Sequence, residues 1–429
     1  MIFNDSKYNS SWNIKSLDQL GEFKRGKSKH RPRNDPALFI DGIYPLIQTG
    51  DIKAANLYIR KHSEMYNGFG LKQSKLWREN TLCITIAANI AETALLGYPM
   101  CFPDSVVGFT AFPDESSEIF MHYVFEYIKE NIQNTIGGSI QDNINIEYLT
   151  GLNFRIPDKP YQDKIAAVLS SLDAKIELNQ RINAELEAMA KTLYDYWFVQ
   201  FDFPDEEGKP YKSSGGKIVW NEALKREIPE GWEVSELGKY CQIYRGVTYT
   251  KEDIKSPSDK NIIPILRATN INNGVIDLND MVYVPEDLVS EDQMLEKYDV
   301  VITMSSGSKA HVGKNAFYYY DNKVSFGAFC SKLSFNKNLR FYVNVHMKSD
   351  SFKKYISNVG LGTSINNLTN KHITEYRLLI PPKKQLLRYE SIVEGFYYKI
   401  GNNLKESQTL TELRDWLLPM LMNGQVKVG

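Results

Sequence analysis

The segment Trp12-Asn-Ile-Lys-Ser-Leu17, with Arg25-Gly26 after it, occurs twice in the chain and so indicates how the whole molecule is organised. The second copy is Trp232-Glu-Val-Ser-Glu-Leu237, and Arg245-Gly246 again follows the tryptophan by thirteen positions. The offset between the copies is 220 residues, from Trp12 to Trp232. Self-similarity at a fixed offset is the sequence signature of a repeated structural unit. We therefore expect two related halves.

Other stretches match at nearly the same offset. Pro45-Leu-Ile-Gln-Thr-Gly-Asp51 corresponds to Pro264-Ile-Leu-Arg-Ala-Thr-Asn270, a short apolar run that leads into a turn. Leu149-Thr-Gly-Leu-Asn-Phe-Arg-Ile-Pro157 corresponds to Ile373-Thr-Glu-Tyr-Arg-Leu-Leu-Ile-Pro381. The β-branched and aromatic runs at 300–304 and 316–320 predict strands, and the periodicity of 119–132 predicts a helix. Each half therefore opens with a mixed α/β domain.

A long helix is predicted after each domain, since no proline occurs between Pro160 and Pro204 or between Pro382 and Pro419. A turn-rich linker joins the halves. The predicted fold class is α+β, with two tandem domains that are each followed by a long helix. The expected boundaries are 1–158 for the first domain, 159–203 for the first helix, 204–231 for the linker, 232–382 for the second domain, 383–423 for the second helix and 424–429 for the tail.

The two predicted helices carry a coiled-coil pattern, with polar residues at the middle of each apolar seam. In an antiparallel pair, facing residues have a constant sum of numbers, and a sum of 586 places Asn183 on Asn403 and Asn179 on Ser407. We expect an antiparallel coiled coil with internal pseudo-two-fold symmetry. Its register would be set by the central amides, because a slip would leave them unpaired. The alternative is two amphipathic helices that each pack only on their own domain.

This register pairs apolar residues with one another in most layers, but it places Leu172 opposite Arg414, which suits a coiled-coil core poorly. The residues of the predicted seam are Ile165, Leu169, Leu172, Ile176, Asn179, Asn183, Leu186, Ala190, Leu193 and Trp197 in the first helix and Tyr389, Val393, Phe396, Ile400, Asn403, Ser407, Leu410, Arg414, Leu417 and Leu421 in the second.

The composition excludes several classes of protein. Lys and Arg number 51 and Asp and Glu number 52, so any nucleic-acid footprint must be a local basic surface. The four cysteines show no C-x-x-C spacing and the six histidines are scattered, which argues against a disulfide framework and a zinc module. The sequence has neither a signal peptide nor a run of about 18 apolar residues. We expect a cytoplasmic protein without a bound metal.

One local motif matches the signature of a nucleotide-binding loop. Gly21-Glu-Phe-Lys-Arg-Gly-Lys27-Ser28 matches the phosphate-loop pattern G-x-x-x-x-G-K-[ST]. A phosphate loop turns from a strand into a helix, whereas a helix-like segment precedes this motif and Pro32 and Pro36 follow it. The equivalent stretch from Gly238 to Gly246 lacks the lysine and the serine. A phosphate-loop NTPase is therefore the weaker alternative, and we expect the isolated chain to bind no ATP.

Two basic loops occupy equivalent places at the repeated Arg-Gly. The first is the densest basic run in the chain, and the second carries hydroxyl groups as well as positive charge. Two basic loops at equivalent places in two symmetry-related halves could each bind one stretch of a DNA duplex. The candidate residues are Lys24, Arg25, Lys27, Lys29, Arg31 and Arg33 in the first loop and Arg245, Thr248, Tyr249 and Lys251 in the second.

Two further pairs of loops carry side chains that can read base edges, as arginine reads guanine and asparagine or glutamine reads adenine. Ordinary turns use the same residue types, so each of these residues also fits a purely structural role. The candidates are Gln48, Thr49 and Asp51 with Arg267, Thr269 and Asn270 in one pair, and Asn89 with Ser305, Ser306, Lys309 and His311 in the other.

Catalytic motifs are missing from the sequence. No Asp/Asn-Pro-Pro-Tyr/Phe tetrad for the methylation of base amino groups is present, since Ile380-Pro-Pro-Lys383 does not match it. Pro204-Asp-Glu-Glu-Gly-Lys209 contains nuclease-type residues, but it falls in the linker, where its carboxylates cannot come from two paired strands around a metal. We expect a non-catalytic protein.

The combination of these features resembles the specificity subunit of type I restriction-modification systems. Duplicated domains open with Trp and Arg-Gly and close with Ile-Pro and a leucine-rich helix, and the linker Gly208-Lys-Pro-Tyr-Lys-Ser-Ser-Gly-Gly-Lys-Ile-Val-Trp220 and the segment Ile228-Pro-Glu-Gly-Trp232 are also similar to that family. The resemblance covers essentially the whole chain. It implies two target recognition domains, which each read one half of a split, asymmetric DNA sequence, with the helices as a ruler for the unread spacer.

The resemblance also implies partners. Two modification subunits would carry S-adenosylmethionine and methylate adenine, and their helices would form a bundle with the long helices of this chain. Restriction subunits would use ATP and magnesium to translocate and cleave DNA, while this chain itself would hold no cofactor. A coiled-coil adaptor that binds protein but not DNA is the remaining alternative, and it would show no salt-dependent affinity for DNA.

Overall fold

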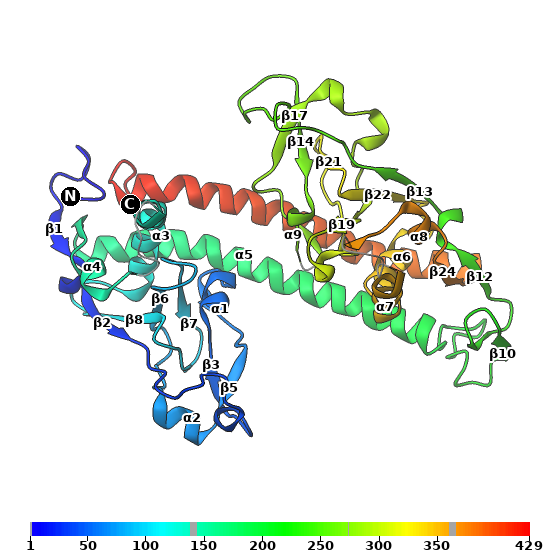
Figure 1. The fold of residues 1–429 in the computed structure, drawn as a ribbon, viewed down its shortest axis with the longest axis horizontal. Helices are drawn as coiled ribbons and strands as arrows, with labels where there is room; N and C mark the ends of the chain where they lie inside the picture. The colour runs from blue at the N-terminus through cyan, green and yellow to red at the C-terminus, as the bar shows by residue number, and fades with distance from the viewer. Residues whose placement is uncertain (1, 138–143, 273, 360–365) are drawn as a thin grey trace. The chain divides into compact units, whose positions relative to one another are not determined.

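The structure is a computed structural model that describes residues 2–137, 144–272, 274–359 and 366–429 (Figure 1). These residues form two compact units. Unit 1 is Met1–Gln180 together with Glu406–Gly429, and unit 2 is Arg181–Lys405. Each unit therefore contains one globular domain and a segment of both long helices.

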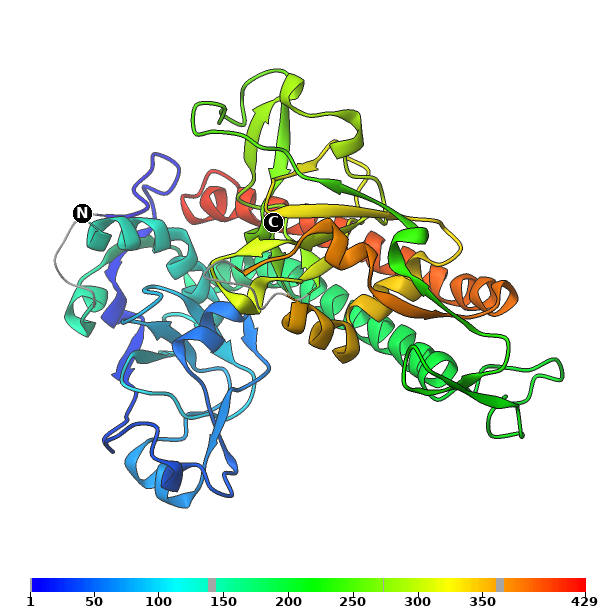
Figure 2. The ribbon, with the colours of Figure 1, turned by 45° about the vertical axis from the view of Figure 1, so that its right-hand side comes forward.

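A five-stranded sheet lies at the centre of unit 1 (Figure 2). Its neighbouring strands are antiparallel except for the last two, which are parallel. Residues along one central strand alternate between two cores: Leu82 and Ile84 pack with helix α3 (Glu118–Gly137), and Cys83 packs with Ile52. Both faces of the sheet are therefore covered. In spatial order the strands are β2 (Gly21–Arg25), β8 (Val106–Ala111), β6 (Leu82–Thr85), β7 (Thr93–Leu96) and β4 (Tyr58–Ile59).

Smaller elements complete the first domain. Strand β1 (Asn13–Ser16), directly after Trp12, pairs antiparallel with β9 (Asn153–Ile156), so the start and the end of the domain meet. The other elements are the antiparallel pair β3 (Tyr44–Leu46) and β5 (Glu64–Tyr66) and the short helices α1 (Thr49–Ala54), α2 (Gly68–Gln73) and α4 (Ile146–Thr150).

Unit 2 repeats this plan with changes. Strand β12 (Glu233–Glu236), directly after Trp232, pairs with β24 (Arg377–Ile380), as β1 pairs with β9 in unit 1. Two helices, α6 (Arg340–Met347) and α7 (Asp350–Val359), occupy the stretch of sequence where unit 1 has the single helix α3. The main sheet is four-stranded, in the order β13 (Cys241–Arg245), β22 (Cys330–Phe335), β18 (Val300–Thr303) and β20 (Asn315–Phe317).

The remaining elements of unit 2 are a three-stranded sheet, three two-stranded pairs and one short helix. They are β17 (Val282–Pro285), β14 (Ile262–Leu266) and β21 (Ser325–Phe326) in the sheet, the pairs β10 (Ile218–Asn221) with β11 (Arg226–Pro229), β15 (Ile271–Asn272) with β16 (Val275–Ile276) and β19 (Ser305–Ser306) with β23 (Asn366–Asn367), and helix α8 (Asn370–Thr374). The hairpin of β10 and β11 lies within the predicted linker, 204–231, after its turn-rich first part.

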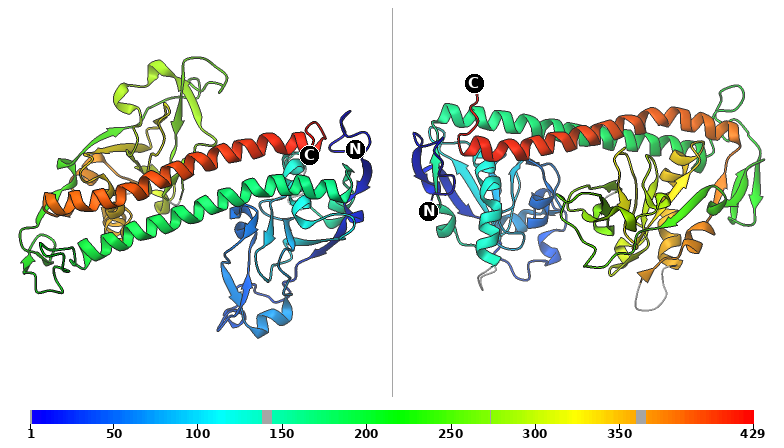
Figure 3. Two further views of the ribbon diagram at one scale, coloured as in Figure 1. Left: turned by 180° about the vertical axis from the view of Figure 1, so that it is seen from behind. Right: turned by 90° about the horizontal axis from the view of Figure 1, so that it is seen from above.

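The two long helices are α5 (Lys159–Tyr194) and α9 (Lys383–Met422), and within each unit their segments lie side by side (Figure 3). In unit 1, Asn179 Nδ2 donates a hydrogen bond to Ser407 Oγ at 3.3 Å. Arg414 of the same unit binds Asp173, so residue numbers rise along one helix as they fall along the other. The pairing in unit 1 is therefore antiparallel, and Asn179 and Ser407 have the predicted sum.

Unit 2 shows the same arrangement. Asn403 Nδ2 donates to Asn183 Oδ1 at 2.8 Å, and Tyr389 Oη donates to the carbonyl oxygen of Ala190 at 3.2 Å. The predicted pairing of Asn183 with Asn403 is therefore present. Every residue of the predicted seam is buried or partly buried. The fold class predicted from the sequence, with two mixed domains and an antiparallel pair of long helices, is confirmed.

The charge of Arg414 is balanced by a residue that the seam pattern did not include. Its guanidinium lies 2.7 Å from Asp173 Oδ1, and Asp173 is only 2% exposed. Tyr123 Oη of helix α3 donates to the same carboxylate at 2.5 Å. Asp173 thus connects both long helices with the first domain, and the layer that looked unsuitable from Leu172 and Arg414 alone contains a buried ion pair.

The first helix ends earlier than the predicted boundary at 203. Its α-helical part stops at Tyr194, and one π-helical turn, Asp195–Val199, follows. Phe201 has a positive φ of 68°, a conformation that cannot continue a right-handed helix. The rings of Phe198, Phe201 and Phe203 pack against Trp232, so this aromatic stretch turns into the second domain's core. None of the helices in the described ranges is both long and apolar enough to cross a lipid bilayer.

Candidate nucleic-acid interface

The repeated Arg-Gly lies at the end of an edge strand in both units, β2 in unit 1 and β13 in unit 2. A Cβ atom on Gly26 would lie 2.2 Å from the carbonyl oxygen of Pro103. A Cβ atom on Gly246 would lie 2.2 Å from the carbonyl oxygen of Gly327. Only glycine permits so close an approach of two backbones. The repeat therefore preserves a backbone crossing and leaves the preceding arginine exposed at the start of a loop.

The basic loop of unit 1 has an acidic residue among its cations. Arg33 binds the carboxylate of Asp104 with distances of 2.8 and 3.0 Å, and Arg31 lies 3.9 Å from it. Arg25 Nε donates to the Asp104 carbonyl oxygen at 2.6 Å. The six predicted cations of this loop, Lys24, Arg25, Lys27, Lys29, Arg31 and Arg33, are all exposed. Asp104 was missed from the sequence, and it lowers the positive potential that these cations create.

The phosphate-loop alternative does not fit this backbone. Gly21–Arg25 form strand β2, whose residues pair with β8 and are not available as a phosphate cradle. Ser28 is buried, and the next regular element is a short 3-10 turn, Pro36–Leu38, instead of a helix that starts at the serine. The structure therefore contradicts the interpretation of Gly21 to Ser28 as a nucleotide-binding loop.

The equivalent loop of unit 2 has no acidic residue paired with its arginine. Arg245, Thr248 and Lys251 are exposed, and Arg245 forms no ion pair with any residue that the structure describes. Tyr249 is half-buried, and burial raises the pKa of its phenol, so the hydroxyl stays protonated and can donate a hydrogen bond. The four predicted residues of this loop thus offer one arginine, one lysine and two hydroxyl groups.

The second pair of loops shares a structural role. Asp51 Oδ2 accepts a hydrogen bond from the amide of Gln48 at 2.7 Å, and Asn270 Oδ1 accepts one from the amide of Arg267 at 2.9 Å. Asn270 also donates to the carbonyl oxygen of Asn279 at 2.8 Å and is only 4% exposed. The structure therefore corrects the expectation for Asn270, because both ends of its amide stabilise the turn and neither can read a base.

The other residues of this loop pair differ in exposure. Gln48 and Thr269 are exposed, while Thr49, Asp51 and Arg267 are partly buried. The guanidinium of Arg267 donates to the carbonyl oxygen of Asp280 at 2.6 Å and to its carboxylate at 2.7 Å. Arg267 would have to leave Asp280 in order to bind guanine. Gln48 also has a carboxylate partner, since its Nε2 donates to Glu64 Oε2 at 3.1 Å. Gln48 and Thr269 are the exposed candidates of this group.

The third pair of loops follows strands β6 and β18. In unit 1, Ala88, Asn89 and Ala91 have positive φ angles of 46°, 48° and 64°, which is strained backbone for residues other than glycine. Asn89 is exposed, and Lys53 Nζ donates to its Oδ1 at 3.3 Å. The corresponding residues of unit 2 are Ser305 and Ser306, which are partly buried in strand β19, and Lys309 and His311, which are exposed on a 3-10 turn.

Sequence reasoning missed the polar contacts that attach the helices to the domains. In unit 2, Glu390 of α9 accepts hydrogen bonds from the amides of Phe341 and Tyr342 at 3.2 and 2.7 Å, at the start of helix α6. Burial raises the pKa of Glu390 to about 7. The sequence offered one signal for such contacts at both Glu390 and Asp173, namely an acidic residue within an apolar stripe of a helix.

Comparisons with known proteins agree with this repeated architecture. Residues 9–188 and 229–411 match the family described as the type I restriction modification DNA specificity domain. The chain is 25% identical to the type I restriction enzyme MjaIX specificity subunit of Methanocaldococcus jannaschii, over 98% of this chain and 95% of that relative. It is 38% identical to the type I restriction enzyme EcoKI specificity subunit of Escherichia coli K12, over 36% of this chain and 34% of that relative.

A solved structure shares the fold. The S subunit of the type I restriction-modification system from M. genitalium superposes with a TM-score of 0.57 at 19% identity, covering 98% of this chain and 99% of the other. The two matched segments of the family coincide with the two halves of the repeat, and each carries one domain and one long helix. The chain is therefore a type I restriction-modification specificity subunit with two target recognition domains, and it belongs to the type I DNA specificity family.

Proposed function

We propose that each domain of this chain reads one half of a bipartite, asymmetric DNA sequence and that the chain has no catalytic site of its own. The observation that carries this proposal is one backbone frame that presents two different sets of side chains. Gly26 and Gly246 make the same backbone approach, yet the loop after Gly26 is strongly basic and the loop after Gly246 is rich in hydroxyl groups. Unlike half-sites require unlike side chains on a common frame.

The exposed cations of these loops suit the DNA backbone. Phosphate contacts hold a protein in position on the duplex, whereas contacts to base edges provide the sequence preference. In this proposal Arg25, Lys27, Lys29 and Arg245 bind phosphates. Gln48 and Thr269 belong to the neighbouring loops, and they are exposed and uncharged, as base-reading residues often are.

The paired helices would set the length of the unread spacer. The hydrogen bonds of Asn179 with Ser407 and of Asn183 with Asn403 support one register, because a slip of either helix would part both pairs. A fixed register would keep the spacer at one length.

Large apolar side chains on the helices support a role as a scaffold for two modification subunits. Exposed apolar groups that cluster on one element usually mark a protein-binding surface. In this proposal S-adenosylmethionine is bound by the modification subunits, and ATP and magnesium are bound by restriction subunits. The exposed groups are Leu178, Leu413 and Trp416 in unit 1 and Met189, Leu387, Ile392 and Tyr398 in unit 2.

The experiment is to sequence the methylated DNA of cells that carry the complex. We expect methylated adenines in a bipartite motif with a spacer of fixed length. Deleting seven paired residues from each helix removes about 10 Å of helix, so the spacer should shorten by about three base pairs of roughly 3.4 Å each. A deletion variant that changes the base preference but keeps the spacer would contradict the role of the helices.

A coiled-coil adaptor is distinguished by its behaviour in salt. We expect the complex with modification subunits to bind its site less tightly as ionic strength rises, and Arg25→Gln and Arg245→Gln to weaken binding. Lys209→Gln is the control, because Lys209 is exposed in the linker and belongs to neither loop. Equal affinity at all ionic strengths would favour the adaptor.

A further inference from the structure

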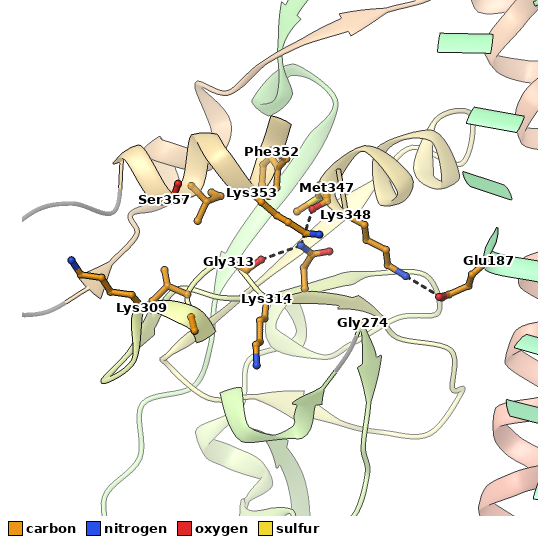
Figure 4. Close-up of a pocket in the computed structure, with 14 residues that line it drawn as sticks. Glu187, Gly274, Lys309, Gly313, Lys314, Met347, Lys348, Phe352, Lys353 and Ser357 are labelled. Atoms are coloured by element: carbon orange, nitrogen blue, oxygen red, sulfur yellow. Dashed lines mark hydrogen bonds and ion pairs between the residues drawn. The ribbon is translucent and has the colours of Figure 1, made fainter. Parts of the chain in front are cut away.

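Unit 2 contains a cavity of about 640 Å³ that the predicted DNA contacts do not use (Figure 4). It lies between the segment that follows strand β19 and the helices α6 and α7. Its apolar lining comes from Val312, Met347, Phe352 and Ile356. Pockets of roughly 300–1,000 Å³ hold ligands with several rings or groups, so this cavity is larger than a phosphate ion alone requires.

Four lysines line the same cavity, which makes an anionic ligand favourable. Lys348 forms an ion pair with Glu187 at 3.0 Å, and Lys353 lies 3.7 Å from the exposed Asp350. Lys309 and Lys314 form no ion pair within the described part of the chain. Figure 4 shows Lys353 reaching over the cavity, while Lys309 and Lys314 extend outward from the facing wall. The positive charge is thus distributed around the cavity.

The cavity lining also includes a carboxamide with an unsatisfied acceptor. Asn315 Nδ2 donates to the carbonyl oxygens of Gly313 and Met347 at 3.1 and 3.2 Å. Asn315 is 8% exposed, and its buried Oδ1 accepts no hydrogen bond from any described residue. Buried acceptors without a donor are uncommon, and one at a cavity points to a ligand that supplies the donor.

We propose that this cavity receives one nucleotide that leaves the base stack of the bound DNA. The base packs on Val312 and Ile356, and its amino group donates to Asn315 Oδ1 once a small shift of the cavity wall uncovers this atom. Lys353 forms an ion pair with the phosphate of this nucleotide, and Lys309 and Lys314 form ion pairs with the flanking phosphates. Proteins that extract a base hold it in this way, between apolar or aromatic side chains and a hydrogen-bonding group.

This inference rests on the proposed function, and the position of the cavity favours DNA over a free nucleotide. Lys309 lines the cavity and also belongs to the loop that the sequence marks as a DNA contact. A nucleotide in the cavity would therefore be continuous with the strand that this loop approaches. The outward direction of Lys309 and Lys314 suits the phosphates on either side of an extracted base.

The test uses the complex with modification subunits and duplexes that carry 2-aminopurine at successive positions of the half-site read by unit 2. Fluorescence of this base rises several-fold when it leaves the stack. We expect a rise at one position that is lost in Val312→Trp, which fills the cavity, and in Asn315→Leu. Methyltransferases also extract their target adenine. A fluorescence rise that persists in Val312→Trp is therefore assigned to the methyltransferase, and only a rise that this variant abolishes is assigned to the cavity. Ile254→Trp is the matched control, since Ile254 is 47% exposed and does not line the cavity.

A second measurement does not depend on filling the cavity. Lys353→Gln should reduce the slope of log Kd against log salt concentration by about 0.9, the value for one phosphate contact. Lys348→Gln should change the slope less, because Glu187 already balances Lys348.

Three outcomes are decisive. In the first, the unmodified complex binds DNA in a salt-dependent way, but no 2-aminopurine signal responds to Val312→Trp and Lys353→Gln leaves the salt slope unchanged. This result would overturn the inference and leave the proposed function intact. Absence of salt-dependent duplex binding by the unmodified complex would refute the proposed function itself. Binding of free deoxynucleoside monophosphates in the absence of DNA, abolished by Val312→Trp, would overturn DNA as the source of the ligand.

Discussion

Asn403 of α9 donates a hydrogen bond to Asn183 of α5 at 2.8 Å, with Asn403 only 1% exposed. A buried amide adds less stability than an apolar side chain of similar size, but it fixes alignment because a shifted helix cannot satisfy it. The equivalent contact of unit 1, between Asn179 and Ser407, has the same sum of residue numbers. The two contacts specify one register for the pair of helices.

Replacing one of the two amides should cost more than replacing both. Asn403→Leu leaves Asn183 without this partner in a half-buried place, and we expect a loss of about 1–3 kcal/mol in the free energy of unfolding. Asn183→Leu combined with Asn403→Leu should recover most of that loss, since two leucines can pack together. Urea unfolding of the four proteins of this cycle measures the effect. Losses that simply add in the double variant would contradict a specific Asn183–Asn403 pair.

Removing Arg414 should destabilise unit 1 strongly. Arg414→Ala leaves the carboxylate of Asp173, which is 2% exposed, without its cation, and breaking a buried pair typically costs about 3–5 kcal/mol. Lys175→Ala is the control, because Lys175 and Glu406 form an exposed pair at 3.5 Å, and exposed pairs contribute about 0–1 kcal/mol. Chemical denaturation compares the two variants. Equal losses would show that Asp173 is solvated in solution.

The sequence predicted the repeat, the second helix and the seam because each depends on the spacing of residues along the chain: matching segments at a fixed offset, the distance between prolines, and apolar residues at heptad positions. The second helix was expected at 383–423, and α9 is Lys383–Met422. Heptad spacing describes only the face toward the partner helix, whereas these helices also bury a face against their domains. Glu390 contacts its domain, and Asp173 contacts both its domain and Arg414 of the partner helix, so their contacts with Tyr342 and Tyr123 could not be predicted from the seam.

Fewer contacts of the candidate DNA interface could be predicted from the sequence. Arg33 and Asp104 are 71 residues apart and meet only through the tertiary fold, so the basic run looked more positive than it is. Asn270 failed as a base-reading residue because the same side chain that reads adenine also stabilises turns. The lysines of the cavity in unit 2 come from separate elements with no motif in common, and only the fold brings them together.

The buried carboxyl of Glu390 should make unit 2 less stable as pH rises. Burial raises its pKa from the ordinary 4.5 to about 7 in the folded protein. Between these values the folded protein holds a proton that the unfolded chain has released. The contribution of Glu390 to the free energy of unfolding therefore falls as pH increases through this range, by at most about 3 kcal/mol.

Glu390→Gln is the variant that isolates this effect, because the amide has nearly the same shape and cannot ionise. We expect its free energy of unfolding, taken relative to that of the unmodified chain, to rise between about pH 5 and about pH 8, because the fall caused by Glu390 is removed. His346 of the same unit has its pKa lowered to about 4 by burial and acts in the opposite direction, but it is present in both proteins. An identical pH dependence of the two proteins would show that Glu390 is ionised throughout.

Neutralising Asp104 should strengthen DNA binding by unit 1. Asp104→Asn releases Arg33 and Arg31 from a carboxylate, so each arginine can bind a phosphate instead. We expect tighter binding by the complex and a steeper salt dependence, with the slope larger by about 0.9 for each additional phosphate that an arginine binds. Asp114→Asn changes the net charge equally at an exposed position with no ion pair among the described residues. Equal effects of both variants would indicate a general charge effect instead of a local one.

Truncating Trp416 should weaken assembly with the modification subunits more than it weakens the chain itself. Trp416 is 55% exposed on α9, and Leu413, one turn away on the same face, is 40% exposed. A tryptophan at the centre of an interface often contributes about 2 kcal/mol or more, which is roughly a 30-fold change in Kd. A binding titration of Trp416→Ala with the modification subunits measures this change. Trp220→Ala is the matched control, since Trp220 is 57% exposed on the β10–β11 hairpin. If both variants assemble as tightly as the unmodified chain, the partner surface lies elsewhere on the helices.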